Sequence, residues 1–157
     1  MPYRTLQGSL NAQSLRIGVI VSRFNEFITE ALEKAALETL EKHGCLMENI
    51  RLVRVPGAWE LAIAAKHLAD HCDAIIALGA VVRGDTPHFD YVAGGAADGL
   101  NRVCLDTGVP IAFGVLTTDN LQQAMDRAGG KSGNKGAEAA EVAIELANLI
   151  PQIRASK

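Results

Sequence analysis

The sequence predicts an α/β fold, a doubly wound, three-layer α/β/α sandwich with helices on both faces of a four-stranded parallel sheet. Short β-branched runs alternate with amphipathic segments in the order βαβαβαβα, and the short connections leave room only for right-handed crossover helices. Aromatic residues make up 4% of the chain. The core must therefore be built mainly from Ala, Val, Ile and Leu, whose small side chains suit close packing of helices on a sheet.

The first expected strand and helix show the change of period clearly. Residues 15–22 form a short apolar run typical of a strand buried on both faces. From 27 to 40 the apolar residues recur at three- and four-residue steps, which predicts an amphipathic helix that ends near Gly44. A second strand is expected at 50–55, where Pro56-Gly57 stops it.

The middle of the chain repeats this pattern. We expect a helix over 59–69 and a third strand over 74–82. Thr86-Pro87 then opens a third helix, because Thr is a good cap and Pro is tolerated at the first helical position. That helix should run toward Gly108.

The last third completes the sandwich with a strand over 110–116, a short helix over 120–128 and a closing helix over 137–149. Between the two helices, Gly129–Gly133 is the one stretch expected to be a flexible loop. Residues 1–14 fit no helix of this core. Tyr3–Leu10 could instead extend and pair with a sheet edge, including that of a neighbouring subunit.

Composition limits the class of protein. A length of 157 residues fits one domain, 1–157, and a formal net charge of −3 gives no dense positive field, so we expect no nucleic-acid partner. The widely spaced Cys45, Cys72 and Cys104 predict reduced core thiols. The chain shows no signal peptide and no apolar run of about 20 residues that would cross a membrane. We therefore expect a soluble, cytoplasmic protein.

Ligands of an open parallel sheet bind beyond the carboxyl ends of its strands, so the segments after those ends are the candidate sites. Phe24 follows the first strand and is either a hydrophobic staple onto Ile28 or a free ring. Trp59 and Glu60 follow the second strand at a helix start. The indole is either part of the core or a stacking surface, and the carboxylate could accept hydrogen bonds from hydroxyl groups.

The segment Arg83–His88 follows the third strand. The helix start created by Thr86 and Pro87 offers free amides and a partial positive charge that suit a phosphate. His88 lies in the first turn, where the dipole favours a neutral imidazole that can take up a proton and return it. The alternative is an ordinary surface histidine. A carboxylate at Asp85 would repel phosphate, so we expect it to face away while its amide binds.

The fourth strand and its surroundings are harder to interpret. Phe113 lies inside the strand and is most simply a core residue, and Arg127 ends a short helix, where a cation complements the dipole. Four glycines with Lys131 and Lys135 follow, a segment that suits an anion. It follows a helix rather than a strand, so it is not a Walker loop, and the chain has no strand-linked Gly-x-Gly-x-x-Gly.

Taken together, these segments resemble the 6,7-dimethyl-8-ribityllumazine synthase family over nearly the whole chain. Each segment alone is a weak signal, and their order and spacing make the resemblance specific. The segments are Ser22-Arg23-Phe24-Asn25, Pro56-Gly57-Ala58-Trp59-Glu60, Gly79-Ala80-Val81-Val82-Arg83-Gly84, Thr86, His88-Phe89-Asp90-Tyr91-Val92, Phe113-Gly114-Val115-Leu116-Thr117-Thr118, Arg127-Ala128-Gly129 and Gly133-Asn134-Lys135-Gly136.

The resemblance implies a flavodoxin-like fold and the penultimate step of riboflavin biosynthesis. In that step 5-amino-6-(D-ribitylamino)uracil condenses with 3,4-dihydroxy-2-butanone 4-phosphate, which releases phosphate and water without metal or organic cofactor. By position, Phe24 would stack on the pyrimidine and His88 would shuttle protons. The ribityl and ring-binding side would be lined by Ala58, Trp59, Glu60, Ala80, Val81 and Val82.

The resemblance assigns the second substrate to a site shared between subunits. The amides of Asp85 and Thr86 would hold the butanone phosphate together with Arg127 of the next subunit. Phe113 and Lys135 of that subunit would close the pocket. The chain departs from the expected pattern in two places. Trp59 stands where we expect a smaller aromatic, which predicts tighter retention of product or a flavin, and Asp85 adds a charge beside the phosphate.

The resemblance also implies assembly. Members form pentamers, and many join twelve pentamers into a hollow icosahedral shell, which can enclose riboflavin synthase. The connection from Gly129 to Gly136 carries no inserted residues and resembles that of shell-forming members, so we predict sixty chains. Two other functions remain open: a non-catalytic flavin carrier that stacks its ligand between Phe24 and Trp59, and a structural cage. Both would tolerate the loss of His88.

Overall fold

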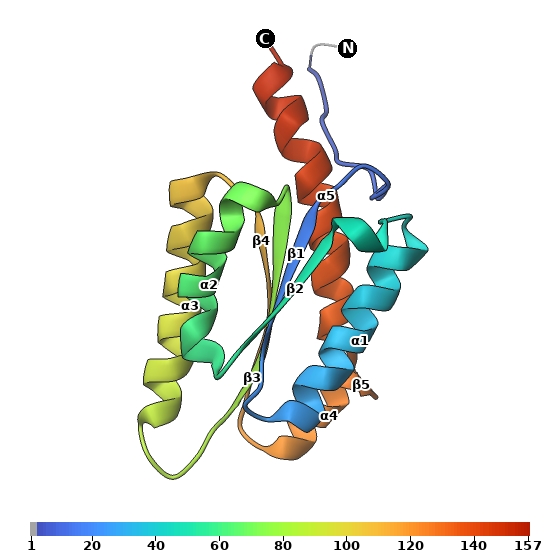
Figure 1. Cartoon of the computed structure of the whole chain (residues 1–157). Coiled ribbons are helices and arrows are strands. Elements are labelled where there is room, and N and C mark those ends of the chain that lie inside the picture. Colours follow the sequence, from blue (N-terminus) through green and yellow to red (C-terminus); the bar gives the residue numbers. More distant parts are fainter. Residues whose placement is uncertain (1–2) are drawn as a thin grey trace.

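Four parallel strands form the centre of the computed structural model, which describes residues 3–157 (Figure 1). They are β1 (Ile17–Ser22), β2 (Ile50–Val55), β3 (Ala74–Val82) and β4 (Ile111–Thr118). Their order across the sheet is β2-β1-β3-β4, so the chain moves outward to one edge and then returns past β1 to the other. The connections that follow the neighbouring strands β1 and β3 therefore lead in opposite directions, and in sheets of this kind a crevice opens at such a point.

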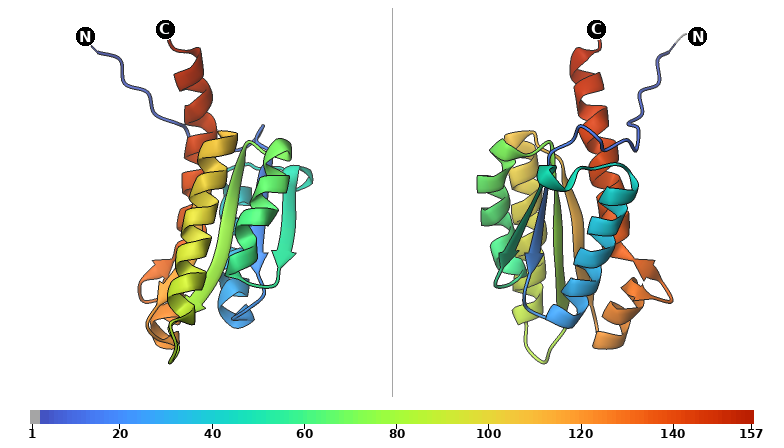
Figure 2. Two further views of the ribbon diagram at one scale, coloured as in Figure 1. Left: turned by 90° about the vertical axis from the view of Figure 1, so that its left-hand side faces the viewer. Right: turned by 45° about the vertical axis from the view of Figure 1, so that its right-hand side comes forward.

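Helices cover both faces of the sheet (Figure 2), and the predicted three-layer sandwich is confirmed. One face carries α1 (Glu26–Lys42) and α5 (Lys135–Ala155), and the other carries α2 (Leu61–Leu68) and α3 (His88–Thr107). The remaining elements are short: η1 (Met47–Asn49), η2 (Ala58–Glu60), η3 (Ala69–His71), α4 (Leu121–Arg127), β5 (Ala128–Gly130) and β6 (Gly133–Asn134).

Aliphatic side chains fill the core, as the composition predicts. Every residue of β1 is buried, and so are all residues of β3 from Ala74 to Val81. Separate clusters of Ala, Val, Ile and Leu lie on the two sides of the sheet. None of the seven aromatic residues, all of which the structure describes, belongs to the buried set. The prediction that Phe113 is core is therefore wrong: it lies on the edge strand β4 and is 40% exposed.

Most elements lie where the pattern predicts them, with shifts at their ends. The helix expected over 59–69 is α2 flanked by the short turns η2 and η3. Helix α5 begins earlier than expected because the side chain of Asn134 accepts hydrogen bonds from the amides of Gly136 (2.8 Å) and Ala137 (3.2 Å). It also continues through Pro151, which removes a single backbone hydrogen bond in the exposed last turns.

The glycine-rich connection after α4 forms a small hairpin where the sequence predicts a loop at Gly129–Gly133, and the flexibility of this segment stays a prediction. Strands β5 and β6 pair in antiparallel fashion as a small hairpin. Gly129 and Gly133 have φ angles of 108° and 84°, values that side chains other than glycine rarely adopt. A Cβ atom on Gly130 would lie 2.7 Å from the Cα of Asp126. These glycines allow the tight turn of the hairpin.

The described part of the N-terminal segment, residues 3–14, contains no strand and packs on α5 instead of a sheet edge of this chain. The side-chain amide of Asn148 donates to the carbonyl oxygens of Ser9 (2.8 Å) and Asn11 (3.0 Å). The amide of Gln152 donates to the carbonyl of Gln7 (3.2 Å). Pairing with the sheet edge of a neighbouring subunit stays a prediction.

The cysteines are free thiols. Cys45 and Cys72 are buried as predicted, whereas Cys104 is only half-buried on α3. Burial raises the pKa of both buried thiols, in the case of Cys72 to about 11. None of the helices in residues 3–157 is long and apolar enough to cross a membrane.

Candidate functional site

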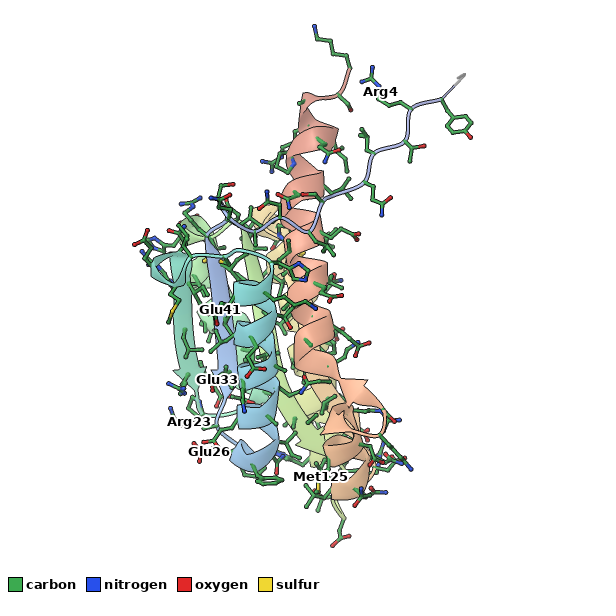
Figure 3. All side chains as sticks on the ribbon, turned by 90° about the vertical axis from the view of Figure 1, so that its right-hand side faces the viewer. Arg4, Arg23, Glu26, Glu33, Glu41 and Met125 are labelled. Atoms are coloured by element: carbon green, nitrogen blue, oxygen red, sulfur yellow. The ribbon has the colours of Figure 1, made fainter. Side chains whose placement is uncertain are left out.

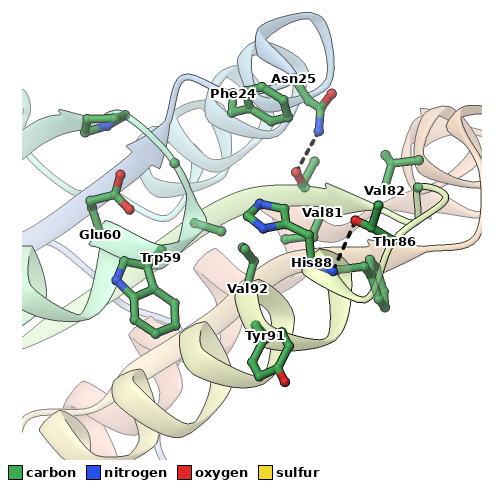
Figure 4. A pocket seen from close by; sticks show the side chains of 16 residues that line it. Phe24, Asn25, Trp59, Glu60, Val81, Val82, Thr86, His88, Tyr91 and Val92 are labelled. Carbon is green, nitrogen blue, oxygen red and sulfur yellow. Dashed lines mark hydrogen bonds between the residues drawn. The ribbon is translucent and has the colours of Figure 1, made fainter.

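A cavity of about 780 Å³ opens at the carboxyl ends of the central strands, where α1, η2 and α3 begin (Figure 4). Nine of the thirteen residues predicted for the site line it: Phe24, Ala58, Trp59, Glu60, Ala80, Val81, Val82, Thr86 and His88. These side chains come from four separate segments of the sequence. The parallel topology brings them together because it places the ends of all strands at the same edge of the sheet.

Phe24 forms one wall of the cavity at the end of β1. Its ring is 71% exposed, which leaves it free for a ligand and rules out the alternative of a staple onto Ile28. The next residue, Asn25, has a left-handed backbone (φ 62°, ψ 47°) and turns the chain into α1. Its side-chain amide donates to the carbonyl oxygen of Ala80 at 2.9 Å, as Figure 4 shows. This bond ties the Phe24 wall to the end of β3.

Trp59 and Glu60 form the opposite wall on η2. The indole is 61% exposed, so the alternative of a core tryptophan is wrong. Its six-membered ring lies against the backbone of α3 at Gly95, where any Cβ atom would overlap the ring. A helix packed this closely on one face of the indole leaves its remaining surface available to a ligand. Glu60 presents a carboxylate to the same cavity.

The floor of the cavity is made of small and β-branched residues. Ala58 and Ala80 are buried, and Val81 is 8% exposed. Short side chains at the end of β3 leave space for a ring system between the two aromatic walls. The floor is therefore apolar, and the polar groups lie on the rim.

His88 is the first residue of α3, and Figure 4 shows its imidazole pointing into the cavity. The hydroxyl oxygen of Thr86 accepts a hydrogen bond from the backbone amide of His88 at 3.4 Å. The helix thus begins at His88, one residue later than the Thr-Pro signal predicts, and the amides around Thr86 lie at its positive end.

Four predicted residues do not line the cavity of this chain: Asp85, Phe113, Arg127 and Lys135. Asp85 is exposed between the lining residues Gly84 and Thr86. Arg127 ends α4, where its guanidinium donates to the carbonyl oxygen of Gln123 at 3.1 Å. Lys135 begins α5 beyond the hairpin. The prediction that three of these residues act in a neighbour's cavity is not tested by a single chain.

The structure adds residues that the prediction did not assign to the site. Asn25, Phe89, Tyr91 and Val92 also line the cavity. The signal for Tyr91 and Val92 was available, because residues three and four positions after His88 lie on the same face of the helix. Asn25 could not be found this way, since its role depends on the distant carbonyl of Ala80.

The arrangement suits a planar heterocycle and an anion. Four of the seven aromatic residues, Phe24, Trp59, Phe89 and Tyr91, line one cavity. An imidazole and the positive end of a long helix stand beside them. Within residues 3–157, no group of three or more His, Cys, Asp or Glu side chains is placed to hold a metal ion. The chemistry within reach is stacking, proton transfer and phosphate binding.

Comparison with known proteins agrees with this geometry. Residues 14–151 match the model of the family described as 6,7-dimethyl-8-ribityllumazine synthase. A protein of that name from Nitratidesulfovibrio vulgaris strain DP4 is 49% identical over 152 residues, which cover 96% of this chain and 97% of the relative. The protein of the same name from strain Hildenborough matches with the same identity and coverage.

Proposed function

Because the chain belongs to the 6,7-dimethyl-8-ribityllumazine synthase family, we propose that it condenses 5-amino-6-(D-ribitylamino)uracil with 3,4-dihydroxy-2-butanone 4-phosphate. The products are 6,7-dimethyl-8-ribityllumazine, phosphate and water. The cavity carries this proposal, because two exposed aromatic walls and an imidazole at a helix start meet in it. The aromatic walls can stack on a heterocyclic amine, the helix start can bind the phosphate of a ketone phosphate, and the imidazole can transfer protons between the two.

The uracil binds between the walls. Its ring stacks on Phe24, which offers a free face. The ribityl chain runs along Ala80, Val81 and Val82, and Glu60 accepts hydrogen bonds from its hydroxyl groups. Trp59 gives the ring a second large aromatic neighbour, which supports tight retention of the product or of a flavin.

The butanone phosphate binds at the start of α3. The amides of Asp85 and Thr86 lie just before the first residue of α3, where the partial positive charge of the helix favours an anion. Arg127 of a neighbouring subunit supplies the charge for the leaving phosphate, because a guanidinium grips two oxygens and stays protonated. The Asp85 carboxylate is exposed and outside the cavity lining, so its charge does not oppose the phosphate from within.

His88 moves the protons of the reaction. The amine attacks the ketone, and the adduct loses water to give an imine. Abstraction of a proton then expels phosphate, and the resulting enol takes up a proton to become a ketone. The second amine attacks this carbonyl, and loss of a second water closes the ring. The imidazole lines the cavity in which both substrates are proposed to bind. A base there can accept a proton in one step and return it in the next. Holding two reactive substrates side by side supplies further acceleration.

The catalytic role of His88 is tested by His88→Ala. We expect lumazine formation, followed by product fluorescence, to slow by about a hundredfold, since general acid–base groups contribute on this scale. The control is His71→Ala, because His71 is an exposed histidine on η3 just before β3, at the other end of the sheet. Unchanged turnover in His88→Ala would refute the assignment and favour a flavin carrier or a structural cage.

The shared phosphate site is tested by Arg127→Ala. The KM for the butanone phosphate should rise about tenfold or more while the KM for the uracil changes little, because only one substrate carries the phosphate. Equal effects on both KM values would contradict this role.

We propose that the functional form is a homo-oligomer of pentamers, with sixty chains in a closed shell, and that it works in the cytoplasm. Phe113, Arg127 and Lys135 lie outside the chain's own cavity, which supports a site completed by a neighbour. The exposed edge strand β2 is open to pairing with a neighbour's N-terminal segment. Free buried thiols suit a reducing compartment. Sedimentation distinguishes monomer, pentamer and shell, and co-purification tests whether riboflavin synthase is enclosed.

A further inference from the structure

We propose that Arg83 is a positioning residue: it does not line the cavity, yet its side chain holds the loop 83–88 that carries Thr86 and His88. The proposal rests on the proposed function and extends it to a residue outside the site. Arg83 directly follows β3, and its backbone amide donates to the carbonyl oxygen of Thr118 at 2.8 Å. The start of the loop is therefore fixed to the end of β4.

The guanidinium of Arg83 contacts both sides of the loop. On one side its Nε atom lies 3.3 Å from the Oδ1 atom of Asp119, just after β4. On the other side its Nη1 atom lies 3.5 Å from the Oδ1 atom of Asp90 in the first turn of α3. The planar group also stacks over the ring of Phe89, with Cζ 4.2 Å from the ring centroid. One side chain thus joins the edge strand to the helix that starts at His88.

The loop itself contributes little packing. Residues 84–87 are all exposed, and a Cβ atom at Gly84 would meet no heavy atom within 4 Å. The hydrogen bond between Thr86 and the amide of His88 is long, at 3.4 Å. The position of this segment relative to the cavity therefore depends on its two ends, and Arg83 connects those ends.

Only an arginine can make these contacts together. Its flat face covers Phe89 while N–H groups on its edge reach two carboxylates, whereas a lysine ammonium is a point charge that cannot do both. Arg83, Asp90 and Asp119 are about half or more exposed, and exposed pairs add little stability. The expected consequence of losing Arg83 is a displaced imidazole and phosphate loop in a protein that still folds.

The test compares Arg83→Met, Arg83→Lys and Asp119→Asn in steady-state assays with each substrate varied. We expect Arg83→Met to lower kcat about tenfold and to raise the KM for the butanone phosphate about fivefold, because small displacements of reacting groups slow catalysis strongly. The KM for the uracil should stay within about twofold, since Phe24 lies on another element. Arg83→Lys and Asp119→Asn should change the same constants in the same direction, but less.

Two further measurements separate positioning from general damage. In the double variant Arg83→Met/Asp119→Asn, kcat should be no lower than in Arg83→Met alone, because the two groups act as a unit. Hydrogen exchange without substrate should quicken at the backbone amides of residue 83, His88 and Asp90, which are hydrogen-bonded at the two ends of the loop. The matched control is Arg16→Met, which breaks an Arg–Asp pair of 3.2 Å with Asp73 at the opposite end of the sheet. It should leave kinetics and exchange at these amides unchanged.

Equal changes in both KM values, additive losses in the double variant, or unchanged exchange would overturn the proposal. If Arg83→Met does not fold, Arg83→Lys and Asp119→Asn carry the same comparison. Hydrogen exchange needs no substrate, and the wild-type assay is run alongside. A wild-type protein that makes no lumazine would therefore refute the proposed function alone. Unchanged hydrogen exchange would refute only the positioning role of Arg83.

Discussion

At the scale of single residues, Asn25 combines an unfavourable backbone conformation with a specific side-chain hydrogen bond. It is the one non-glycine residue with a positive φ angle in the described part of the chain. Asparagine tolerates this region better than most residues, and its amide here reaches the carbonyl of Ala80. The unfavourable conformation lies beside Phe24, at the point where the cavity wall turns into α1.

Substitution of Asn25 separates the backbone effect from the anchor. Asn25→Ala removes the hydrogen bond to Ala80 and places a residue that tolerates positive φ poorly at this position. It should lower the free energy of unfolding by about 1–3 kcal/mol. Asn25→Gly removes only the hydrogen bond to Ala80. It should lower the free energy of unfolding by less, because glycine adopts positive φ freely. Urea unfolding followed by circular dichroism measures both. A larger loss in Asn25→Gly than in Asn25→Ala would contradict this account.

Cys72 makes stability depend on pH in the alkaline range. Burial raises its pKa in the folded protein from 9.0 to about 11. The unfolded thiol therefore loses its proton first as the pH rises. Between pH 9 and 11 the folded state holds more protons than the unfolded state, so stability falls with increasing pH.

Cys72→Ala tests this dependence. Relative to the variant, the wild type should lose roughly 1 kcal/mol or less per pH unit above pH 9, and no differential loss should appear below it. Unfolding measured from pH 7 to 10.5 on both proteins gives the comparison. Parallel curves for the two proteins over this range would show that the thiol does not titrate as described.

At the scale of elements, helix α5 lies unusually close to α1. Gly136, in the first turn of α5, is buried against the backbone carbonyl of Leu32, and any Cβ atom there would overlap it. Glu33 of α1, labelled in Figure 3, is buried. Its carboxylate pairs with the guanidinium of Arg54 on β2. Helix α1 is thus held from two sides, by α5 and by the edge strand.

Gly136→Ala should disturb this contact. Because the clash is with backbone, the helices must move apart, and we expect the free energy of unfolding to fall by about 1–3 kcal/mol, the usual cost of overpacking. The control is Glu30→Ala on the exposed side of α1, with a change of about 0.5 kcal/mol or less. If Gly136→Ala were as stable as the wild type, the close contact between α5 and α1 would not be required for stability.

At the scale of the whole molecule, the proposed site is split between two copies of the chain. His88 lines the cavity, whereas Arg127 lies outside it on α4. Neither copy then holds a complete site by itself. This division makes activity depend on assembly and allows defective chains to complement one another.

Mixing His88→Ala with Arg127→Ala tests the split site. After joint unfolding and reassembly at equal amounts, about a quarter of the interfaces join an intact His88 to an intact Arg127. Assayed with the butanone phosphate below its KM, activity should recover toward that fraction of the wild-type value, well above the activity of either variant alone. Activity of the mixture that equals the average of the two variants would indicate that both groups act within one chain.

Much of the fold and of the candidate site follows from local pattern. The β-branched runs predict all four strands of the main sheet, because strands buried on both faces must be apolar throughout. Segments at the strand ends predict Phe24, Trp59, Glu60, Thr86 and His88, and the family resemblance adds Ala58, Ala80, Val81 and Val82 to the residues that line the cavity. Local pattern fails where contacts join distant residues. The bond from Asn25 to Ala80 is of this kind. So is the pairing that places β4 at the edge of the sheet, where the ring of Phe113 is exposed.

The sequence by itself determined the order of elements, the aliphatic core and the class of chemistry at the strand ends, because these depend on residue type and short-range period. Only the tertiary structure decided which side chains share the cavity and which hold it in place. Arg83 belongs to the second group: its partners Asp119 and Phe89 come from different elements. Such contacts depend on the packing of the sheet and helices in three dimensions, which no local pattern records.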